Sequence, residues 1–290
     1  MTPFAPGGAT DFFSRLLARH LQASLQQGVV VDNRGGAGGL LGTELAARAD
    51  PDGYTLLFTT NSTTTIGPNL YKKAPYDPLK DLTPINKVVQ VVGLLVAHPR
   101  VKAGNVSELI ALANAQSAPL TYASSGTGAI GHLAGELFQA KTGVRLTHIP
   151  YKGGAPSITG LIGGEADLSF AQFPTVISHI KAGRLKLLAV TSHKRTRLLP
   201  DVPTVAEGGV PGYAADGWQG LFGPAGLPRQ IVARLDGEVR KILQSADFNQ
   251  TLSVQGAEPD FLGPKEFRDY LRSDFGQWKQ LIDRNRISID

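Results

Sequence analysis

Three short loops of this 290-residue chain share a design that suits the binding of an anion. They are Pro6–Asp11, Ser124–Gly128 and Lys152–Ala155, and each lies between a short apolar segment and the start of an amphipathic helix. The first turn of a helix has backbone N–H groups without acceptors, and glycines let an anion approach them closely. Three or four such contacts could supply several of the roughly 8 kcal/mol that a micromolar ligand needs. The same pattern is also typical of tight strand-to-helix turns, so each loop taken alone leaves both interpretations open.

Motifs of familiar enzyme sites are missing from the sequence. No Lys-Ser/Thr pair follows the glycines as in a P-loop, and the G-x-S-x-G motif of serine hydrolases is absent. The Gly-rich segment Asn33–Gly39 is not followed by an acidic residue at the distance expected in a dinucleotide-binding site. No pair among the six histidines has metal-ligand spacing on a helix, and there is no cysteine. Ser124 and Ser125 lie close to His132 in the sequence, but no acidic partner is evident. We therefore expect no catalytic residue, no metal and no cofactor.

The elements that position these loops alternate between short apolar segments and amphipathic helices, which predicts an α/β fold. The length suggests two domains of roughly 150 residues. The expected helices are 11–26, 105–116, 130–141, 175–182, 229–245 and 264–285, and residues after 223 are expected to be helical throughout. The expected strands are 29–31, 54–59, 120–123, 145–149, 167–171, 187–191 and 217–223, with a long extended stretch at 85–97.

Composition excludes several classes of protein. The fractions of hydrophobic (42%) and charged (18%) residues are ordinary for a globular chain, and no apolar run approaches the roughly 18–20 residues of a membrane span. The net charge of +5 is scattered apart from residues 193–197, so we expect no nucleic-acid partner. The chain starts without a signal peptide and with only Thr2–Phe4 as a first strand, from which we expect that upstream residues are missing.

Eight segments in order along the chain carry a family resemblance. They are PFAPGGATD (3–11), VDNRGGAGG (31–39), PDGYTLL (51–57), YASSG (122–126), HLAGELF (132–138), PYKG (150–153), LAVTS (188–192) and LPDVPT (199–204). Together they resemble the substrate-binding receptors of tripartite tricarboxylate transporters, also called the Bug family. The resemblance runs over essentially the whole chain.

This resemblance implies a two-lobed, periplasmic-binding-protein-like (type II) α/β fold, with a sheet flanked by helices in each lobe. It places lobe one at 1–97 plus 222–290, lobe two at 98–221, hinge strands at 87–97 and 217–223, and the ligand cleft between the lobes. The implied function is that of a periplasmic, monomeric solute receptor. It would bind a small carboxylate, such as a dicarboxylate or an aromatic acid, for the membrane subunits of a tripartite tricarboxylate-type transporter.

The resemblance also implies where a carboxylate would bind. The loop Ser124–Gly128 would hold it with His132 nearby, the loop Phe4–Thr10 would contact it from the other lobe, and residues 60–64 and 170–173 would line the remaining wall. Many relatives have an acidic residue where this chain has Ala171-Gln172, which favours a ligand without an ammonium group. The predicted ligand-binding residues are Phe4, Pro6, Gly7, Gly8, Ala9, Thr10, Asn61, Ser62, Ser124, Ser125, Gly126, Thr127, Gly128, His132, Tyr151, Phe170, Ala171 and Gln172.

Two other functions stay open at the level of sequence. A cytosolic carboxylate sensor of the same fold would explain the missing signal peptide, although no helix-turn-helix segment for reading DNA is evident. An enzyme acting on a carboxylate or a phosphate ester would need a catalytic group that the motifs do not supply.

Overall fold

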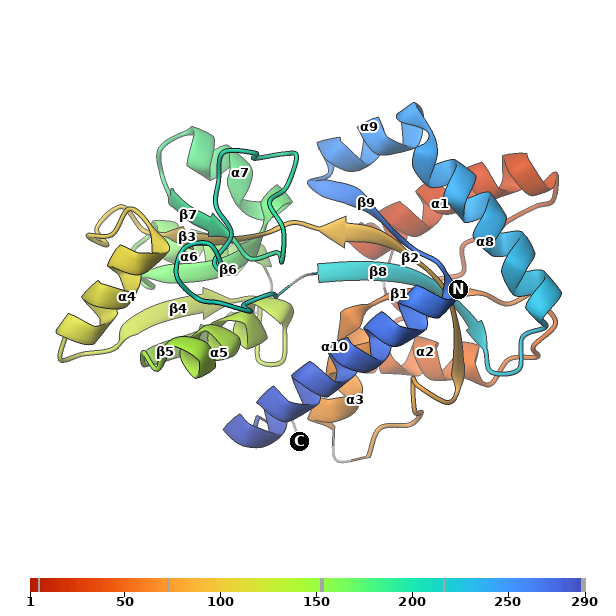
Figure 1. The fold of residues 1–290 in the computed structure, drawn as a ribbon, viewed down its shortest axis with the longest axis horizontal. Helices are drawn as coiled ribbons and strands as arrows, with labels where there is room; N and C mark the ends of the chain where they lie inside the picture. The colour runs from red at the N-terminus through yellow and green to blue at the C-terminus, as the bar shows by residue number, and fades with distance from the viewer. Residues whose placement is uncertain (5, 72, 152–153, 216, 288–290) are drawn as a thin grey trace. The chain divides into compact units, whose positions relative to one another are not determined.

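The structure is a computed structural model that describes residues 1–4, 6–71, 73–151, 154–215 and 217–287. The chain forms two compact units (Figure 1). Unit 1 comprises Met1–Gln90, Trp218–Val254 and Pro259–Asp290, and unit 2 comprises Val91–Gly217 and Gln255–Glu258. Each unit is built around one β-sheet with helices on its faces, so the predicted α/β class with two helix-flanked sheets is confirmed.

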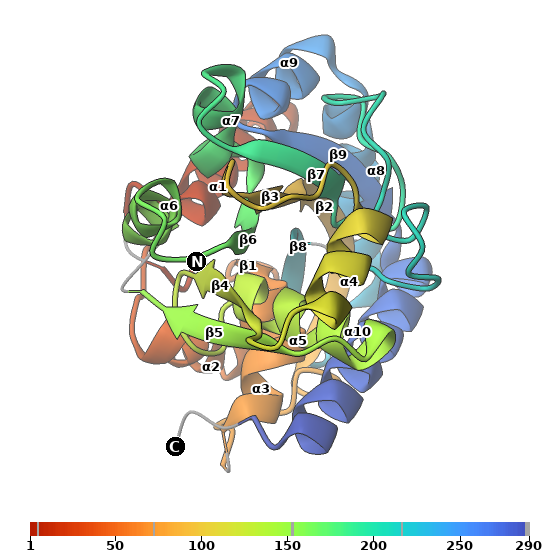
Figure 2. The same cartoon turned by 90° about the vertical axis from the view of Figure 1, so that its left-hand side faces the viewer.

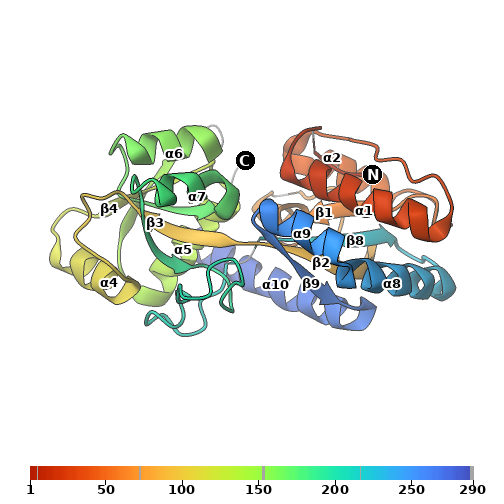
Figure 3. The same cartoon turned by 90° about the horizontal axis from the view of Figure 1, so that it is seen from above.

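Unit 1 has a four-stranded sheet in the order β1-β8-β2-β9. Helices α1 and α2 lie on one face of this sheet and α10 lies on the other (Figure 3). Its elements are α1 (Ala9–Leu25), the 3-10 turn η1 (Ala37–Gly39), α2 (Leu40–Ala47), β1 (Leu57–Thr60), the π-helix η2 (Ser62–Ile66), α3 (Gly67–Leu70), β2 (Leu82–Val91), β8 (Gly217–Pro224), α8 (Arg229–Gln244), α9 (Ala246–Val254), β9 (Ala257–Leu262) and α10 (Pro264–Asn285).

The core of unit 1 forms where α10 packs on β8. Trp218 and Phe222 of β8 are buried against Phe267 and Leu271 of α10, and the rings of Trp218 and Phe267 meet edge to face with centroids 5.4 Å apart. Asp274, one turn further along α10, is half-buried and accepts a hydrogen bond from the Trp218 indole nitrogen at 3.0 Å. A carboxylate that has lost part of its hydration needs such a donor, so this contact helps to fix the position of α10 along the strand.

Unit 2 has a five-stranded sheet in the order β5-β4-β6-β3-β7. Helices α6 and α7 cover one face, and α4 and α5 cover the other (Figure 2). The elements are β3 (Gly93–Ala97), α4 (Val106–Ala115), β4 (Leu120–Ser124), α5 (Ile130–Thr142), β5 (Leu146–Pro150), α6 (Gly154–Ile162), β6 (Leu168–Gln172), α7 (Phe173–Lys181) and β7 (Lys186–Val190).

Strand direction in unit 2 brings several loops to one edge of the sheet. Strand β4 is parallel to β5 and β6, and its last residue Ser124 is in register with Pro150, the last residue of β5. Strand β3 is antiparallel to β6, so its first residue Gly93 lies opposite Gln172, the last residue of β6. Loops that follow parallel strands therefore gather at this edge, where open α/β sheets commonly bind ligands.

Two sequence predictions of secondary structure are wrong. Residues 29–31 form no strand in the described chain: Val30 is 85% exposed, and the neighbouring residue Asn33 makes only an isolated bridge to Thr2. Three valines favour extended backbone, but a strand also needs a partner. The region after residue 223 contains β9, which was expected to be helical. Its sequence contains Pro259 and two acidic residues, which are uncommon in strands, so its pattern does not indicate a strand. Strand β9 lies at the edge of the sheet, where a proline is tolerated because no ladder hydrogen bond is lost.

The chain passes between the units inside the segments expected as hinge strands, 87–97 and 217–223, but not at the expected lobe boundaries. The units divide at Gln90/Val91 and Gly217/Trp218, whereas the sequence analysis placed the lobe boundaries at 97/98 and 221/222. Residues 93–97 pair with β6 and β7 and therefore belong to the sheet of unit 2. The run from Val88 to Ala97 is apolar almost throughout, so its composition does not mark the change from one sheet to the other.

Gly135 of α5 provides a test of the packing in unit 2. A Cβ atom at this position would overlap the Tyr122 ring, whereas no described atom lies within 4 Å of the corresponding point at Gly276 of α10. We expect Gly135→Ala to lower the free energy of unfolding by about 1–3 kcal/mol through overpacking. Gly276→Ala should raise it by about 0.5–1 kcal/mol, because alanine loses less backbone entropy in a helix.

Thermal unfolding followed by circular dichroism would measure both variants. Equal melting temperatures for Gly135→Ala and Gly276→Ala would mean that α5 does not pack tightly on Tyr122.

Candidate functional site

The start of α5 is the point around which the candidate site of unit 2 is assembled. A Cβ atom at Gly131 would lie 2.5 Å from the Phe170 carbonyl oxygen and 3.7 Å from the Ser124 Cβ. Glycine therefore allows the helix to begin directly against the ends of β4 and β6. The end of β6, which is distant in the sequence, thus meets the end of β4 and the start of α5.

The loop from Ser124 to Gly128 is held in shape by its own side chains. The Ser124 hydroxyl donates to the Gly126 carbonyl at 3.1 Å and accepts from the Gly126 amide at 3.2 Å. The Gly128 amide donates to Nδ1 of His132 at 3.1 Å. Gly126 and Gly128 have φ values of 139° and 80°, which favour glycine. The amides of Gly126 and Gly128, which the sequence analysis expected to face an anion, thus have acceptors within the protein. Ser125 and Thr127 are exposed.

Two histidines stack beneath this loop. The rings of His132 and His148 are nearly parallel, with centroids 4.0 Å apart, and His148 also stacks on Tyr122 at 4.9 Å. Burial lowers the pKa of His132 to about 4. Burial, and secondly the nearby His132, lower the pKa of His148 to about 4. Both imidazoles are therefore neutral near pH 7.

The partner of Ser124 is a different histidine from the one that sequence proximity suggested. Its hydroxyl lies 2.7 Å from Nε2 of His148, whereas His132 bonds the Gly128 amide instead. His148 was not predicted as a site residue. The available signal was strand register: β4 and β5 run parallel, which places His148 next to Tyr122, two residues from Ser124.

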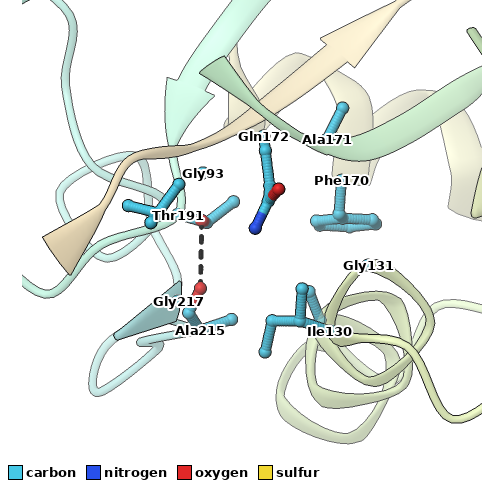
Figure 4. Close-up of a pocket in the computed structure, with 11 residues that line it drawn as sticks. Gly93, Ile130, Gly131, Phe170, Ala171, Gln172, Thr191, Ala215 and Gly217 are labelled. Atoms are coloured by element: carbon cyan, nitrogen blue, oxygen red, sulfur yellow. Dashed lines mark hydrogen bonds between the residues drawn. The ribbon is translucent and has the colours of Figure 1, made fainter. Parts of the chain in front are cut away.

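A small pocket extends the site along the sheet edge (Figure 4). It encloses about 260 Å³, including the part that is open to solvent. The Gln172 amide points into this space, between the Phe170 ring and Thr191 (Figure 4). The structure thus brings the predicted residues Phe170, Ala171 and Gln172 to the start of α5. The lining residues are Val91, Gly93, Ile130, Gly131, Ala134, Phe170, Ala171, Gln172, Thr191, Ala215 and Gly217.

Gly93 and Thr191 are pocket residues that the sequence analysis missed. Gly93 begins β3 and Thr191 directly follows the neighbouring strand β7, and the Thr191 amide donates to the Gly93 carbonyl at 2.8 Å. The Thr191 hydroxyl donates to the Ala215 carbonyl at 3.2 Å. Neither residue belongs to a loop between a strand and a helix, so the loop pattern in the sequence could not single them out.

Tyr151 bonds the loop through its backbone amide. Its amide donates to the Ser124 carbonyl at 3.0 Å. Its hydroxyl donates to Glu165 at 2.7 Å, and burial together with this carboxylate raises the pKa of Tyr151 to about 12. The hydroxyl is thus bonded within unit 2 itself. Lys152 and Gly153 of the third predicted loop lie outside the described residues.

The predicted residues of unit 1 lie on two loops. Pro6, Gly7, Gly8 and Ala9 are exposed and Thr10 is buried, with Gly8 as the N-cap of α1; Ala5 lies outside the described residues. The Gly7 amide donates to the Asp11 carboxylate at 2.9 Å. This resembles a capping box, in which an acidic side chain of the first helical turn bonds an amide just before the helix. The amide of Gly7 therefore also has an internal acceptor.

The second loop of unit 1 approaches the first through Gly39. A Cβ atom at Gly39 would lie 3.0 Å from the Phe4 ring and would also contact Thr63. Asn61 is buried, and the half-buried Ser62 begins the π-helix η2. Short π-helical turns are rare and often occur at functional sites. Phe4 and the 61–65 segment thus meet within unit 1, with Gly39 as a contact that was not predicted.

The described residues offer neither a metal cluster nor a membrane-spanning helix. Within the described ranges, no group of three or more His, Cys, Asp or Glu side chains could hold a metal ion. No helix in this part of the chain has both the length and the apolar character needed to cross a bilayer.

Comparison with protein families gives one match over almost the whole chain. The model of the tripartite tricarboxylate transporter family receptor matches residues 13–287. Among curated proteins, BugT of Bordetella pertussis is 38% identical over 283 residues, which cover 97% of this chain and 87% of BugT.

Solved structures of similar proteins share the fold. Rpa4515 of R. palustris, solved with adipate, is 34% identical with a TM-score of 0.82 and coverage of 99% of this chain and 97% of its own. The periplasmic binding protein BugD is 35% identical, with a TM-score of 0.77 and coverage of 99% and 96%. MatC of Rhodopseudomonas palustris, solved with malate, is 29% identical, with a TM-score of 0.77 and coverage of 97% and 98%.

Asp11 provides a test of how the first loop is held. Hydrogen bonds from Arg15 and from the Gly7 amide lower the pKa of Asp11 to about 2. A depressed carboxyl pKa stabilises the fold above the unfolded-state value, and this contribution is lost as the pH falls through the folded-state value. We expect Asp11→Asn to lower the free energy of unfolding by about 1–2 kcal/mol at pH 7.

The difference between Asp11→Asn and the parent protein should shrink from about pH 4 towards pH 2. Urea unfolding at several pH values would measure it, with the exposed Asp50→Asn as the control. A difference that stays constant down to pH 2.5 would contradict a charged, hydrogen-bonded Asp11.

Proposed function

This chain belongs to the tripartite tricarboxylate transporter receptor family, and we propose that it is a periplasmic receptor for a small dicarboxylate. The family consists of solute-binding receptors, so the chain is a receptor and not an enzyme. The alternative of an enzyme acting on a carboxylate or phosphate ester is therefore wrong. The serine–histidine contact at Ser124 belongs to the support of the loop.

The loop at the start of α5 is the observation that carries the proposal. Its backbone is fixed by Ser124 and His132, and it presents the exposed side chains of Ser125 and Thr127. Hydroxyl groups and the unpaired amides of a first helical turn can donate hydrogen bonds to a carboxylate. The partial positive charge of the helix start favours an anion in the same place. One carboxylate of the ligand would bind here.

The adjoining pocket supports a ligand with an apolar middle portion and no ammonium group. Phe170, Ala171 and Ile130 supply apolar surface, and the neutral amide of Gln172 is a polar group that can donate or accept. No residue that lines this described pocket is acidic. An ammonium group would therefore lose its hydration here without gaining a counter-charge. Two relatives were solved with adipate and with malate, both of which are dicarboxylates.

The remaining parts of the proposal concern unit 1, the location and the partners. Loop 4–10 and residues 61–62 would provide further ligand contacts, by the resemblance to the family. The family description names a transporter, so the proposed partner is the set of membrane subunits of a tripartite tricarboxylate-type system. The relative BugD is a periplasmic binding protein, which supports a periplasmic location. We propose that the receptor acts as a monomer.

Titration calorimetry tests the ligand class. The panel would contain adipate, malate, benzoate, acetate and glutamate. We expect adipate or malate to bind with a dissociation constant in the micromolar range, about 8 kcal/mol of binding free energy. Mass spectrometry should recover the bound acid unchanged. If benzoate alone binds tightly, the ligand class is an aromatic acid and not a dicarboxylate. If none of the acids gives heat, the proposal is overturned.

Thr127 provides a test of the carboxylate loop. We expect Thr127→Ala to weaken adipate or malate binding by roughly 1–2 kcal/mol, because the acid loses a hydroxyl donor. Thr147 is an exposed threonine of β5 in the same unit, and Thr147→Ala should leave the affinity unchanged. If Thr127→Ala and Thr147→Ala bind the acid with equal affinity, loop 124–128 does not contact the ligand. In unit 1, Gly8→Val tests the contribution of loop 4–10 in the same assay.

A further inference from the structure

The loop Ser124–Gly128 of unit 2, here called the carboxylate loop, is hydrogen-bonded at both ends to one pair of stacked histidine rings. Ser124, at the start of the loop, lies 2.7 Å from Nε2 of His148, and Gly128, at its end, donates to Nδ1 of His132 at 3.1 Å. The two imidazole rings stack on each other with an angle of 17° between their planes. A shift of either ring would therefore move one end of the loop and disturb the other ring.

Hydrogen-bond geometry defines the protonation of His132. The Gly128 amide can only donate, so Nδ1 of His132 must carry a lone pair and the ring proton must sit on Nε2. A second proton on Nδ1 would turn this contact into two opposed N–H groups. The ring is 6% exposed, so water has little access to replace the lost acceptor. His132 supports the loop only as a neutral imidazole.

His148 completes a directional chain of hydrogen bonds. The Ser124 hydroxyl has one proton, which its 3.1 Å contact with the Gly126 carbonyl uses. With the proton of His148 on Nε2, the ring donates to Ser124 and the hydroxyl donates onward to Gly126, so every donor finds an acceptor. This arrangement needs a donor at the Nε2 position of residue 148, and the neutral ring already supplies it.

Few groups near the two rings could stabilise a positive charge on either histidine. Glu136, on α5, has an oxygen 3.9 Å from Nε2 of His132, and the same oxygen accepts from the Tyr122 hydroxyl at 2.8 Å and from Gln139 at 2.9 Å. Tyr122, on β4, stacks on His148 and stays protonated, since burial raises its pKa. Glu136 is thus the one acidic group among the described residues that these contacts bring to the stack.

We infer that His148 and His132 are positioning residues that set the shape of the carboxylate loop through Ser124 and Gly128, and that His132 does so only while its ring is neutral. This inference rests on the proposed function for its effect on ligand affinity. His148 itself need not touch the ligand: it acts by holding the Ser124 hydroxyl and, through it, the Gly126 carbonyl.

Paired amide substitutions separate the two ring nitrogens. A glutamine amide reaches roughly the position of an imidazole Nε2, and an asparagine amide reaches roughly that of Nδ1. His148→Gln should therefore keep the donor to Ser124, and His148→Asn should lose it. At residue 132 the order is reversed, because His132→Asn keeps an acceptor for Gly128 and His132→Gln does not. All four variants lose the aromatic stack, so each pair differs only in the hydrogen bond.

Calorimetry with adipate is the first readout. We expect His148→Asn and His132→Gln to bind at least about tenfold more weakly than their partners His148→Gln and His132→Asn. If the parent protein binds adipate and the members of each pair bind equally, the inference is overturned. If the parent protein binds none of the acids in the panel, the proposed function fails, and the second readout still decides how the loop is held.

The second readout uses the parent protein with ¹⁵N-labelled histidine. At pH 7 the nuclear magnetic resonance signals of His132 should show the proton on Nε2, and both stacked rings should titrate well below pH 6.5, with the four variants providing the assignment. A proton on Nδ1 of His132 at pH 7, or a normal titration of the His132 ring, would overturn the inference.

The same titration has a consequence for stability. Burial lowers the folded-state pKa of both rings to about 4, so the unfolded chain takes up protons first. The stabilisation from the neutral pair is complete above about pH 6.5 and is lost as the pH falls towards 4. The melting temperature should fall over this range more in the parent protein than in the double variant His148→Gln with His132→Asn. Parallel pH profiles would contradict a neutral stack.

Discussion

The close packing of α5 on the ends of β4 and β6 is the constraint on which the candidate site depends. Gly131 and Gly135 leave no room for a Cβ atom, so the helix lies directly against Phe170 and Tyr122. This approach places the first turn of α5 beside the loop that leaves β4. Parallel pairing of β4 with β5 and β6 brings the ends of these strands to the same edge, and with them nearly every predicted residue of unit 2. A larger residue at either glycine would separate the loop from the pocket.

Polar groups at the loops are satisfied before any ligand arrives. Gly7 donates to Asp11, Gly126 donates to Ser124 and Gly128 donates to His132. A loop that is already fixed by such bonds loses little conformational entropy on binding, so more of the contact energy remains as affinity. The glycines thus serve the shape of the loop, and the exposed hydroxyls and the remaining amides of the helix start are left for an anion. This division explains why a receptor needs glycines and small polar residues in the same few positions.

In the proposed receptor, selectivity and affinity would depend on different parts of unit 2. The loop and the helix start can attract any carboxylate, because they offer donors and a partial positive charge. The pocket with Phe170, Thr191 and Gln172 has a particular shape and no acidic residue, so it can distinguish the rest of the molecule.

The sequence by itself determined the family and the α/β class, and it predicted the loops at which an anion could bind. Alternating apolar segments, helix starts and glycine patterns are local features, and eight ordered motifs carry the resemblance. Only the tertiary structure decided which side chains support these loops. His148, Gly93 and Thr191 reach the site through strand pairing, and Ser124 bonds a histidine 24 residues away rather than the nearer His132. Pairing register depends on long-range contacts, which no local pattern encodes. For the same reason the strand at 29–31 was wrongly predicted and β9 was missed, because a strand exists only where another strand accepts its hydrogen bonds.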